Sequence, residues 1–342
     1  MNDYQNLDLV DVGAVVVRPV LISKIVADVA KNGDSYLRFE FMDGDAVREA
    51  KMFSASIDMM ASKGIDVGSI VDAKILIDNF GGSKNFKFKE IDLNHDPSLS
   101  KADFVRYPPE DIDKMFREIR LLVLKSSEGY MVCNGGWNYA PLSDLVLSIL
   151  SDYMSDYKTS SAAESMHHNH IGGLIYHSYM MAKTADAICD VYDYLDRELL
   201  VCGAVLHDIG KLRAYATSEF GAANRTVDCI LEEHLFIGAE MIGRYGEKKY
   251  NGRCCNPEKV RLLKHMILSH HGKLEWGAPV LPATPEAFVL SFIDDMDAKL
   301  FMFVEAYKNM APGEKTDKSV RGLDRRVYKP DYFTDRQYDE WG

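Results

Sequence analysis

The first 95 residues alternate between apolar and polar side chains with the period of two that is typical of strands. In the clearest stretch, Leu37, Phe39 and Phe41 are separated by polar residues, which predicts a strand with one buried face. Further strands are predicted over residues 13–30, 46–53, 69–78 and 86–93, with a short helix over 54–63. Five strands with a helix between the third and fourth is the order of an OB-fold. This all-β barrel often binds single-stranded nucleic acid, although other small barrels share the order.

Residues 96–110 read as a linker that closes with Pro108-Pro109, and beyond them the apolar residues follow the period of helices. Helices are predicted over residues 111–125, 141–157, 173–191, 197–213, 229–245, 257–271 and 284–307. The last has Thr284 as its N-cap and Pro285 at its first position. We therefore expect a multidomain chain. An all-β barrel should span 1–95, an all-α domain 111–312 and a basic C-terminal tail 313–342.

The composition points to a soluble protein. The formal net charge of −12 disfavours adhesion to nucleic acid over the whole surface, but it allows a local basic groove or a metal centre. We find no secretory signal and no apolar run near the ~20 residues that a membrane span needs, so we expect a cytoplasmic protein without a membrane partner. The six cysteines form no Cys-x-x-Cys pair, which favours reduced thiols over a cysteine metal site.

Nine of the ten histidines fall between positions 167 and 271, and several lie with aspartates on apolar helices. A single histidine of this kind is more often a hydrogen-bonded core residue than a ligand. Several core-facing imidazoles and carboxylates, however, must be paired or bind metal, because buried unpaired polar groups are costly. The ordered set predicts a metal site of His177, His207, Asp208, His234, His270, His271 and Asp294. Imidazole with carboxylate suits Mn, Fe, Co, Ni or Zn.

This ordered set resembles the HD superfamily of metal-dependent phosphohydrolases, with Leu206-His-Asp-Ile-Gly-Lys211 as the HD motif. The chain is more closely similar to the YhaM-type 3′→5′ exoribonuclease family, which joins an OB-fold to an HD domain. Further segments carry that resemblance: His167–His177, His234–Gly238, Ser269–Gly272, Ile293–Lys299, Leu323–Pro330 and two barrel strands. The resemblance implies a nuclease that shortens single-stranded RNA to nucleoside 5′-monophosphates.

Site chemistry and the resemblance together imply two divalent ions, with manganese expected first and Fe, Co, Ni, Zn or Mg as alternatives. Asp208 is expected to bridge the ions. Lys211, one turn beyond His207, is expected to reach the scissile phosphate, the alternative being a solvated helix-end lysine. His168 is expected to protonate the leaving 3′-oxygen.

Single-stranded RNA or DNA is the expected partner. The strand with Lys84, Phe86, Lys87 and Lys89 is a candidate RNA surface, since aromatics can stack on bases while lysines neutralise phosphates. In the alternative, Phe86 and Phe88 share one face and lie in the core. Arg325 and Arg326 of the tail are further candidates for the substrate path.

Other functions stay open at this point. One is an HD-type phosphohydrolase of free or cyclic nucleotides with a regulatory OB domain. Another is a non-catalytic single-strand-binding module, and a third is a DNA nuclease. The oligomeric state, including a homo-oligomer, is also left open.

Overall fold

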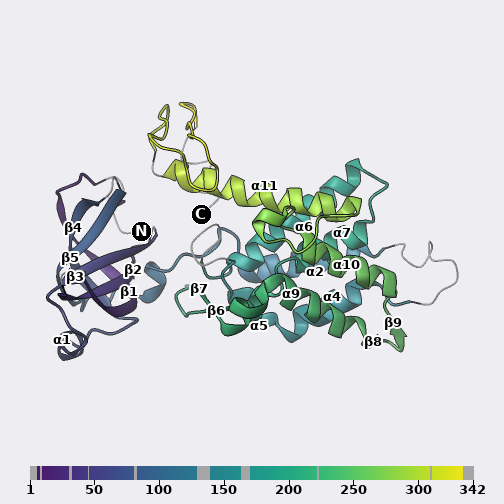
Figure 1. The fold of residues 1–342 in the computed structure, drawn as a ribbon, viewed down its shortest axis with the longest axis horizontal. Coiled ribbons are helices and arrows are strands. Elements are labelled where there is room, and N and C mark those ends of the chain that lie inside the picture. Colours follow the sequence, from purple (N-terminus) through teal and green to yellow (C-terminus); the bar gives the residue numbers. More distant parts are fainter. Residues whose placement is uncertain are drawn as a thin grey trace. The chain divides into compact units, whose positions relative to one another are not determined.

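The computed structural model describes residues 6–7, 10–30, 33–44, 46–80, 83–128, 139–162, 170–221, 223–308 and 310–333. The chain divides into two compact units, Met1–Arg106 and Tyr107–Gly342 (Figure 1). The division falls within the segment 96–110 that we expected to be a linker. None of the helices in the described ranges combines the length and the apolar character that crossing a membrane requires.

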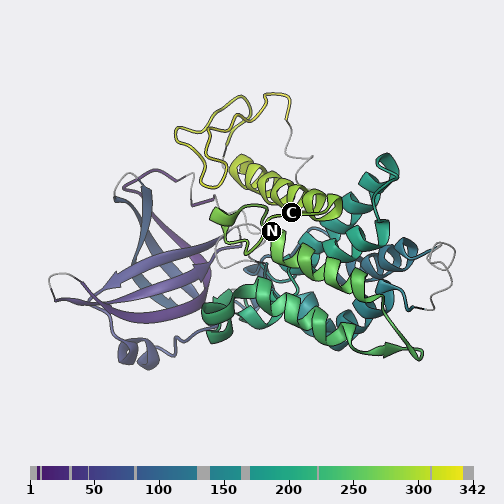
Figure 2. The same cartoon turned by 45° about the vertical axis from the view of Figure 1, so that its right-hand side comes forward.

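The first unit is a closed five-stranded barrel (Figure 2). Its elements are β1 (Val15–Val29), β2 (Ser35–Met42), β3 (Val47–Phe53), α1 (Ile57–Ser62), β4 (Ile70–Phe80) and β5 (Ser83–Leu93). The strand order is β1-β2-β3-β5-β4, in which β3 and β5 are parallel and the other pairs antiparallel. The helix between β3 and β4 and this closure are those of an OB-type barrel, which confirms the predicted fold. A short 3₁₀ turn, η1 (Lys101–Asp103), follows the barrel.

The barrel interior is filled by the alternate residues that the period of two predicted. Leu37, Phe39 and Phe41 are buried, and Phe86 and Phe88 of β5 pack against them. The Phe88 ring lies 5.1 Å from that of Phe41 and 5.3 Å from that of Phe39, centroid to centroid. The prediction that Phe86 stacks on bases was therefore wrong, because the residue is only 7% exposed and its ring packs edge-on against Phe41 inside the barrel.

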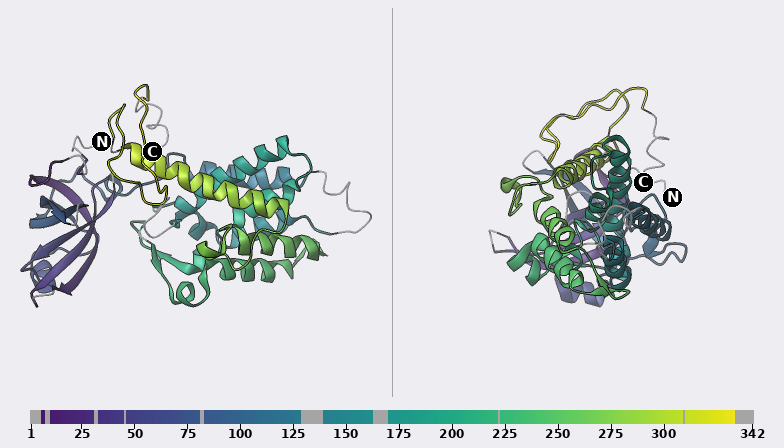
Figure 3. Two further views of the ribbon diagram at one scale, coloured as in Figure 1. Left: turned by 45° about the horizontal axis from the view of Figure 1, so that its top comes forward. Right: turned by 90° about the vertical axis from the view of Figure 1, so that its right-hand side faces the viewer.

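The second unit is mainly helical (Figures 1 and 3). Its helices are α2 (Ile112–Ser126), α4 (Leu142–Asp152), α5 (Met154–Thr159), α6 (Gly173–Val191), α7 (Arg197–Leu206), α8 (Lys211–Ala214), α9 (Val227–Gly246), α10 (Pro257–Ser269) and α11 (Pro285–Lys308). Two short hairpins, β6–β7 (Tyr215–Thr217 and Ala223–Arg225) and β8–β9 (Lys249–Tyr250 and Arg253–Cys254), and a 3₁₀ turn, η2 (Leu274–Trp276), were not predicted.

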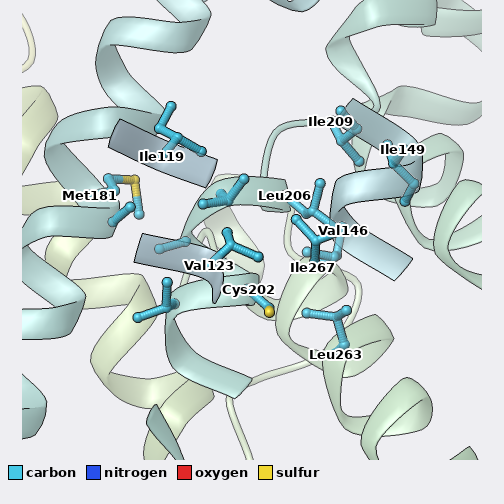
Figure 4. Close-up of a cluster of buried hydrophobic side chains, with 14 of the residues drawn as sticks. Ile119, Val123, Val146, Ile149, Met181, Cys202, Leu206, Ile209, Leu263 and Ile267 are labelled. Atoms are coloured by element: carbon cyan, nitrogen blue, oxygen red, sulfur yellow. The ribbon is translucent and has the colours of Figure 1, made fainter. Parts of the chain in front are cut away.

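Helix α7 runs through the middle of this unit. It contacts α2, α4, α6, α10 and α11, and its residues from Glu198 to Leu206 are buried. Figure 4 shows Cys202 and Leu206 of α7 among apolar side chains of the neighbouring helices, such as Val123 and Ile267. A helix that is apolar on every side belongs in a core. The residues that follow its C-terminal end are consequently placed in the interior.

Several helix boundaries differ from the prediction. The helix expected over 141–157 is interrupted at Tyr153, and the one expected over 197–213 ends at Leu206, after which residues 207–210 form a turn. Helix α9 contains a non-helical residue, Glu233, at φ 61° and ψ 156°. The predicted N-cap of the last helix is confirmed, since the Thr284 hydroxyl accepts the Ala287 N–H at 3.2 Å.

The described part of the C-terminal tail is folded. Lys329 is 3% exposed, and its ammonium group donates to the carbonyl oxygens of Tyr307 in the last turn of α11 and of Met310 beyond it. Arg325 and Arg326 are exposed.

Candidate metal centre

All seven predicted metal ligands come together in the helical unit. His177 lies on α6, His207 and Asp208 follow α7, His234 lies on α9 just beyond its kink, and Asp294 lies on α11. His270 and His271 directly follow α10. Three sets of donor atoms from these residues lie within 4.8 Å of one another: His177–His207–Asp208, His207–His270–Asp294 and His234–His270–His271. The structure thus gathers imidazole and carboxylate donors from five helices in one place.

The first part of the cluster is centred on His177 and His207. Their Nε2 atoms are 3.1 Å apart. The Asp294 Oδ1 atom lies 3.2 Å from Nε2 of His177 and 4.0 Å from that of His207. The Asp208 Oδ2 atom is 3.2 Å from Nε2 of His207. These four donors point at one small region, as the ligands of a single cation would.

Asp208 joins this part to the remaining imidazoles. Its second oxygen, Oδ1, lies 3.5 Å from Nε2 of His234 and 3.6 Å from Nε2 of His270. The His271 ring completes this side, with its centroid 4.6 Å from that of His270. One carboxylate therefore faces two groups of imidazoles, an arrangement suited to bridging two ions.

Four of the five imidazoles are held from behind through Nδ1. His207, His270 and His271 contact the carbonyl oxygens of residues 204, 267 and 276 at 2.9, 2.7 and 2.9 Å. His177 contacts the Asp297 carboxylate at 2.6 Å. A partner of this kind fixes the proton on Nδ1 and leaves the Nε2 lone pair for a metal, and it also fixes the ring orientation.

Several buried polar atoms of the cluster lack a hydrogen-bond partner within the part of the chain that the structure describes. They are Asp208 Oδ1 and both ring nitrogens of His234. Leaving such atoms unpaired costs roughly 1–3 kcal/mol each. A divalent cation would satisfy the carboxylate oxygen and an imidazole nitrogen together, and nitrogen with oxygen is a donor set for first-row metals. The residues present therefore fit divalent ions.

The electrostatics of the cluster agree with this. Burial lowers the pKa of His234 well below its ordinary value and that of His270 to about 3, so both rings are in the neutral form that binds metal. Burial would raise the pKa of Asp208, but Lys211 and His207 hold it well below its usual range. Burial would lower the pKa of His177, but hydrogen bonds to Asp294 and Asp297 raise it to about 10. The two carboxylates thus favour a positive charge between them, which a metal ion would supply.

Gly210 and Glu233 shape the centre and were not predicted to do so. A Cβ on Gly210 would lie 1.9 Å from the carbonyl oxygen of His234 and 2.7 Å from the Gly238 nitrogen, so the backbone of α9 rests directly on the turn that carries Asp208. Glu233 holds a backbone conformation that costs about 1–3 kcal/mol, and it precedes His234. The glycine within the HD motif was the available signal for the first, and the sequence holds no comparable signal for the second.

The other predicted site residues are placed as follows. Lys211 donates to Asp208 Oδ2 at 2.6 Å and is on the edge of the cluster. His168 lies outside the described residues. On β5 of the barrel, Lys84 donates to the Val10 carbonyl, Lys87 to Asp78, and Lys89 is exposed.

Comparison with known proteins matches the model of the HD domain to residues 174–299, a range that contains all seven clustered residues. A protein of Listeria innocua named "3′-5′ exoribonuclease YhaM" is 31% identical over 94% of this chain and 97% of its own length. Proteins of the same name from Bacillus velezensis and Bacillus subtilis are each 28% identical over the same shares of both chains. With this identity over nearly the full length of both chains, the protein belongs to the YhaM family of 3′-5′ exoribonucleases.

Proposed function

We propose that this protein is a metal-dependent 3′→5′ exoribonuclease that hydrolyses single-stranded RNA to nucleoside 5′-monophosphates. The observation that carries the proposal is the convergence of five imidazoles and two carboxylates with unpaired donor atoms on a buried spot. The names of the relatives give the direction and the substrate class.

The proposed ligands fall into two groups that share Asp208. His177, His207 and Asp294 would hold one ion, and His234, His270 and His271 the other. Manganese is our first expectation for the ions. Bound divalent ions lower the pKa of water and neutralise charge on phosphoryl oxygens.

The protein's own groups orient the substrate around that centre. Lys211 is 11% exposed at its side chain, so its ammonium group can donate to a phosphoryl oxygen while it still contacts Asp208. His168 is our candidate for protonating the leaving 3′-oxygen. Lys84, Lys87 and Lys89 of the barrel and Arg325 and Arg326 of the tail are proposed to contact the RNA backbone, because ammonium and guanidinium groups pair with phosphates. The free cysteines among the described residues suit the cytoplasm.

A time course on end-labelled RNA tests the proposal. With Mn²⁺, RNA labelled at its 3′ end should release labelled mononucleotide at once, whereas RNA labelled at its 5′ end should shorten step by step. Chelator should stop both reactions, and DNA of the same sequence run in parallel measures the preference for RNA. Release of mononucleotide first from the 5′ end, or release of orthophosphate from free nucleotides without RNA shortening, would contradict the proposal.

A further inference from the structure

An exposed tryptophan follows the histidine pair of the candidate metal centre along the chain. Trp276 ends η2, the turn that follows His271, and 47% of it is exposed. Its carbonyl oxygen contacts His271 Nδ1 at 2.9 Å, so the residue is separated from the ligand nitrogen by a single imidazole ring. Leaving a large aromatic side chain in water forgoes the stabilisation that its burial would give. Its position beside the centre therefore suggests a ligand for the ring.

The turn that carries the indole is built to hold it in place. The Lys273 carbonyl oxygen accepts both the Trp276 N–H at 3.1 Å and the Ala278 N–H at 3.3 Å. Gly272 and Gly277 flank the turn at φ 75° and 89°, a conformation that glycine adopts without strain. The ring is thus presented by a hydrogen-bonded turn rather than by a loose loop.

Two ammonium groups accompany the ring. Nζ of Lys273 lies 4.1 Å from the indole centroid, and Nζ of Lys299, from α11, lies 5.9 Å from it. Lys299 is further steadied by Asp295 at 2.5 Å. Helix α11 also carries Asp294, so both segments that form this patch provide a proposed metal ligand. An exposed aromatic ring accompanied by lysines is a combination with which proteins bind single-stranded nucleic acid without reading its sequence.

We propose that Trp276 stacks on a base near the 3′ end of the RNA strand while Lys273 and Lys299 neutralise its phosphates, an inference that rests on the proposed exoribonuclease function. Every base has a π-face, so such a platform serves each nucleotide in turn. It places the strand end next to the ligands of the metal centre. It would also add positive charge locally to a protein whose net charge is −12.

The test compares Trp276→Ala and Trp276→Phe with Tyr194→Ala. Tyr194 is an exposed aromatic in the turn after α6, and the end of that helix at Val191 lies about 21 Å along its axis from His177. Binding of fluorescein-labelled single-stranded RNA is measured by anisotropy in chelator, where no turnover occurs, and KM is measured with Mn²⁺. Trp276→Ala should raise Kd about 5- to 150-fold, Trp276→Phe should keep most of the affinity and Tyr194→Ala all of it.

A second RNA, abasic at its last three 3′ positions, separates stacking from a structural role. The wild type should bind it more weakly than the intact RNA, and Trp276→Ala should cause no further loss. Lys273→Gln should reduce the salt dependence of RNA binding: the negative slope of the logarithm of the association constant against the logarithm of the salt concentration should become smaller in magnitude by about 0.7. The inference is overturned if Trp276→Ala binds intact RNA like the wild type, if its loss persists on abasic RNA, or if it loses bound metal.

The same measurements distinguish the inference from the function on which it rests. RNA hydrolysis by the wild type with no effect of Trp276→Ala would remove the platform and keep the exoribonuclease. Weakened RNA binding by Trp276→Ala without hydrolysis by the wild type would keep the platform and remove the exoribonuclease.

Discussion

Asp208→Asn removes the carboxylate that faces both groups of imidazoles while keeping the shape of the side chain. Its two oxygens lie 3.2 Å from His207 Nε2 and 3.5 Å from His234 Nε2, so this one side chain faces both groups. An amide cannot supply two anionic oxygens to two cations. We expect the variant to lose metal binding and RNA hydrolysis and to stay folded.

The size of the effect on stability follows from linkage. An ion present at 100 times its Kd stabilises the folded state by about 2.7 kcal/mol. For a unit of this size, about 2–4 °C of melting temperature correspond to 1 kcal/mol, so each ion should raise Tm by about 5–11 °C. In chelator the variant loses the charged hydrogen bond from Lys211, which is worth about 1.5–3 kcal/mol. This loss is offset because the variant no longer buries a charged carboxylate oxygen, Oδ1, without a hydrogen-bond partner among the described residues.

Melting curves with Mn²⁺ and with chelator, together with metal analysis of the purified protein, measure these quantities. The wild type should show the Mn²⁺-dependent rise in Tm and Asp208→Asn none, with similar Tm values for both in chelator. Asp228→Asn is the matched control, because Asp228 is half exposed and pairs with Arg213, and neither residue is a proposed ligand. Two ions per chain and a full Tm shift in Asp208→Asn would refute the reasoning.

Three further predictions concern the packing around the centre. Gly210→Ala should lower the free energy of unfolding, measured with urea, by at least about 1–3 kcal/mol and reduce metal content, because the added Cβ would overlap backbone atoms. In the control Gly243→Ala, a Cβ would meet only the flexible Lys264 side chain at 3.4 Å, so that variant should be as stable as the wild type or more stable. Equal effects of the two substitutions would contradict this. Glu233→Gly should be more stable than Glu233→Ala by about 1–3 kcal/mol, because glycine adopts the positive φ of this position without strain. Within a helix alanine is usually the more stabilising of the two residues, so finding that order here would show that no strain is stored at Glu233. Burial lowers the pKa of His265, whose Nε2 accepts the Ala283 N–H. The unfolded chain therefore takes up this proton first, and the free energy of unfolding should fall as pH drops below about 6.5. His265→Gln should flatten that part of the curve of unfolding free energy against pH, and an unchanged curve would contradict this role of His265.

Much of the architecture could be predicted because its signals are local. The period of two in Leu37, Phe39 and Phe41 fixes a buried face whatever the strand pairs with, and the barrel followed from the order of such segments. The clustered residues could be predicted because polar residues on apolar helix faces need partners. All seven residues that lie together in the structure belong to the predicted set.

Other features depend on which segments meet. The sequence pattern of β5 left open whether Phe86 stacks on bases or lies in the barrel, and its parallel pairing beside β3 settled this in favour of the core. The helical pattern continued past Leu206, yet the chain turns there, because the backbone of α9 occupies the space beside Gly210.

The sequence by itself therefore determined the two kinds of domain, the strand and helix faces and the set of candidate ligands, since each rests on the spacing of residues along one segment. The tertiary structure alone decided that Asp208 faces both groups of imidazoles, that Asp297 holds His177 from behind, and that Trp276 stands exposed beside His271. These relations join segments up to 120 positions apart. Their distances are set by the packing of five helices around α7, and no period along the chain encodes them.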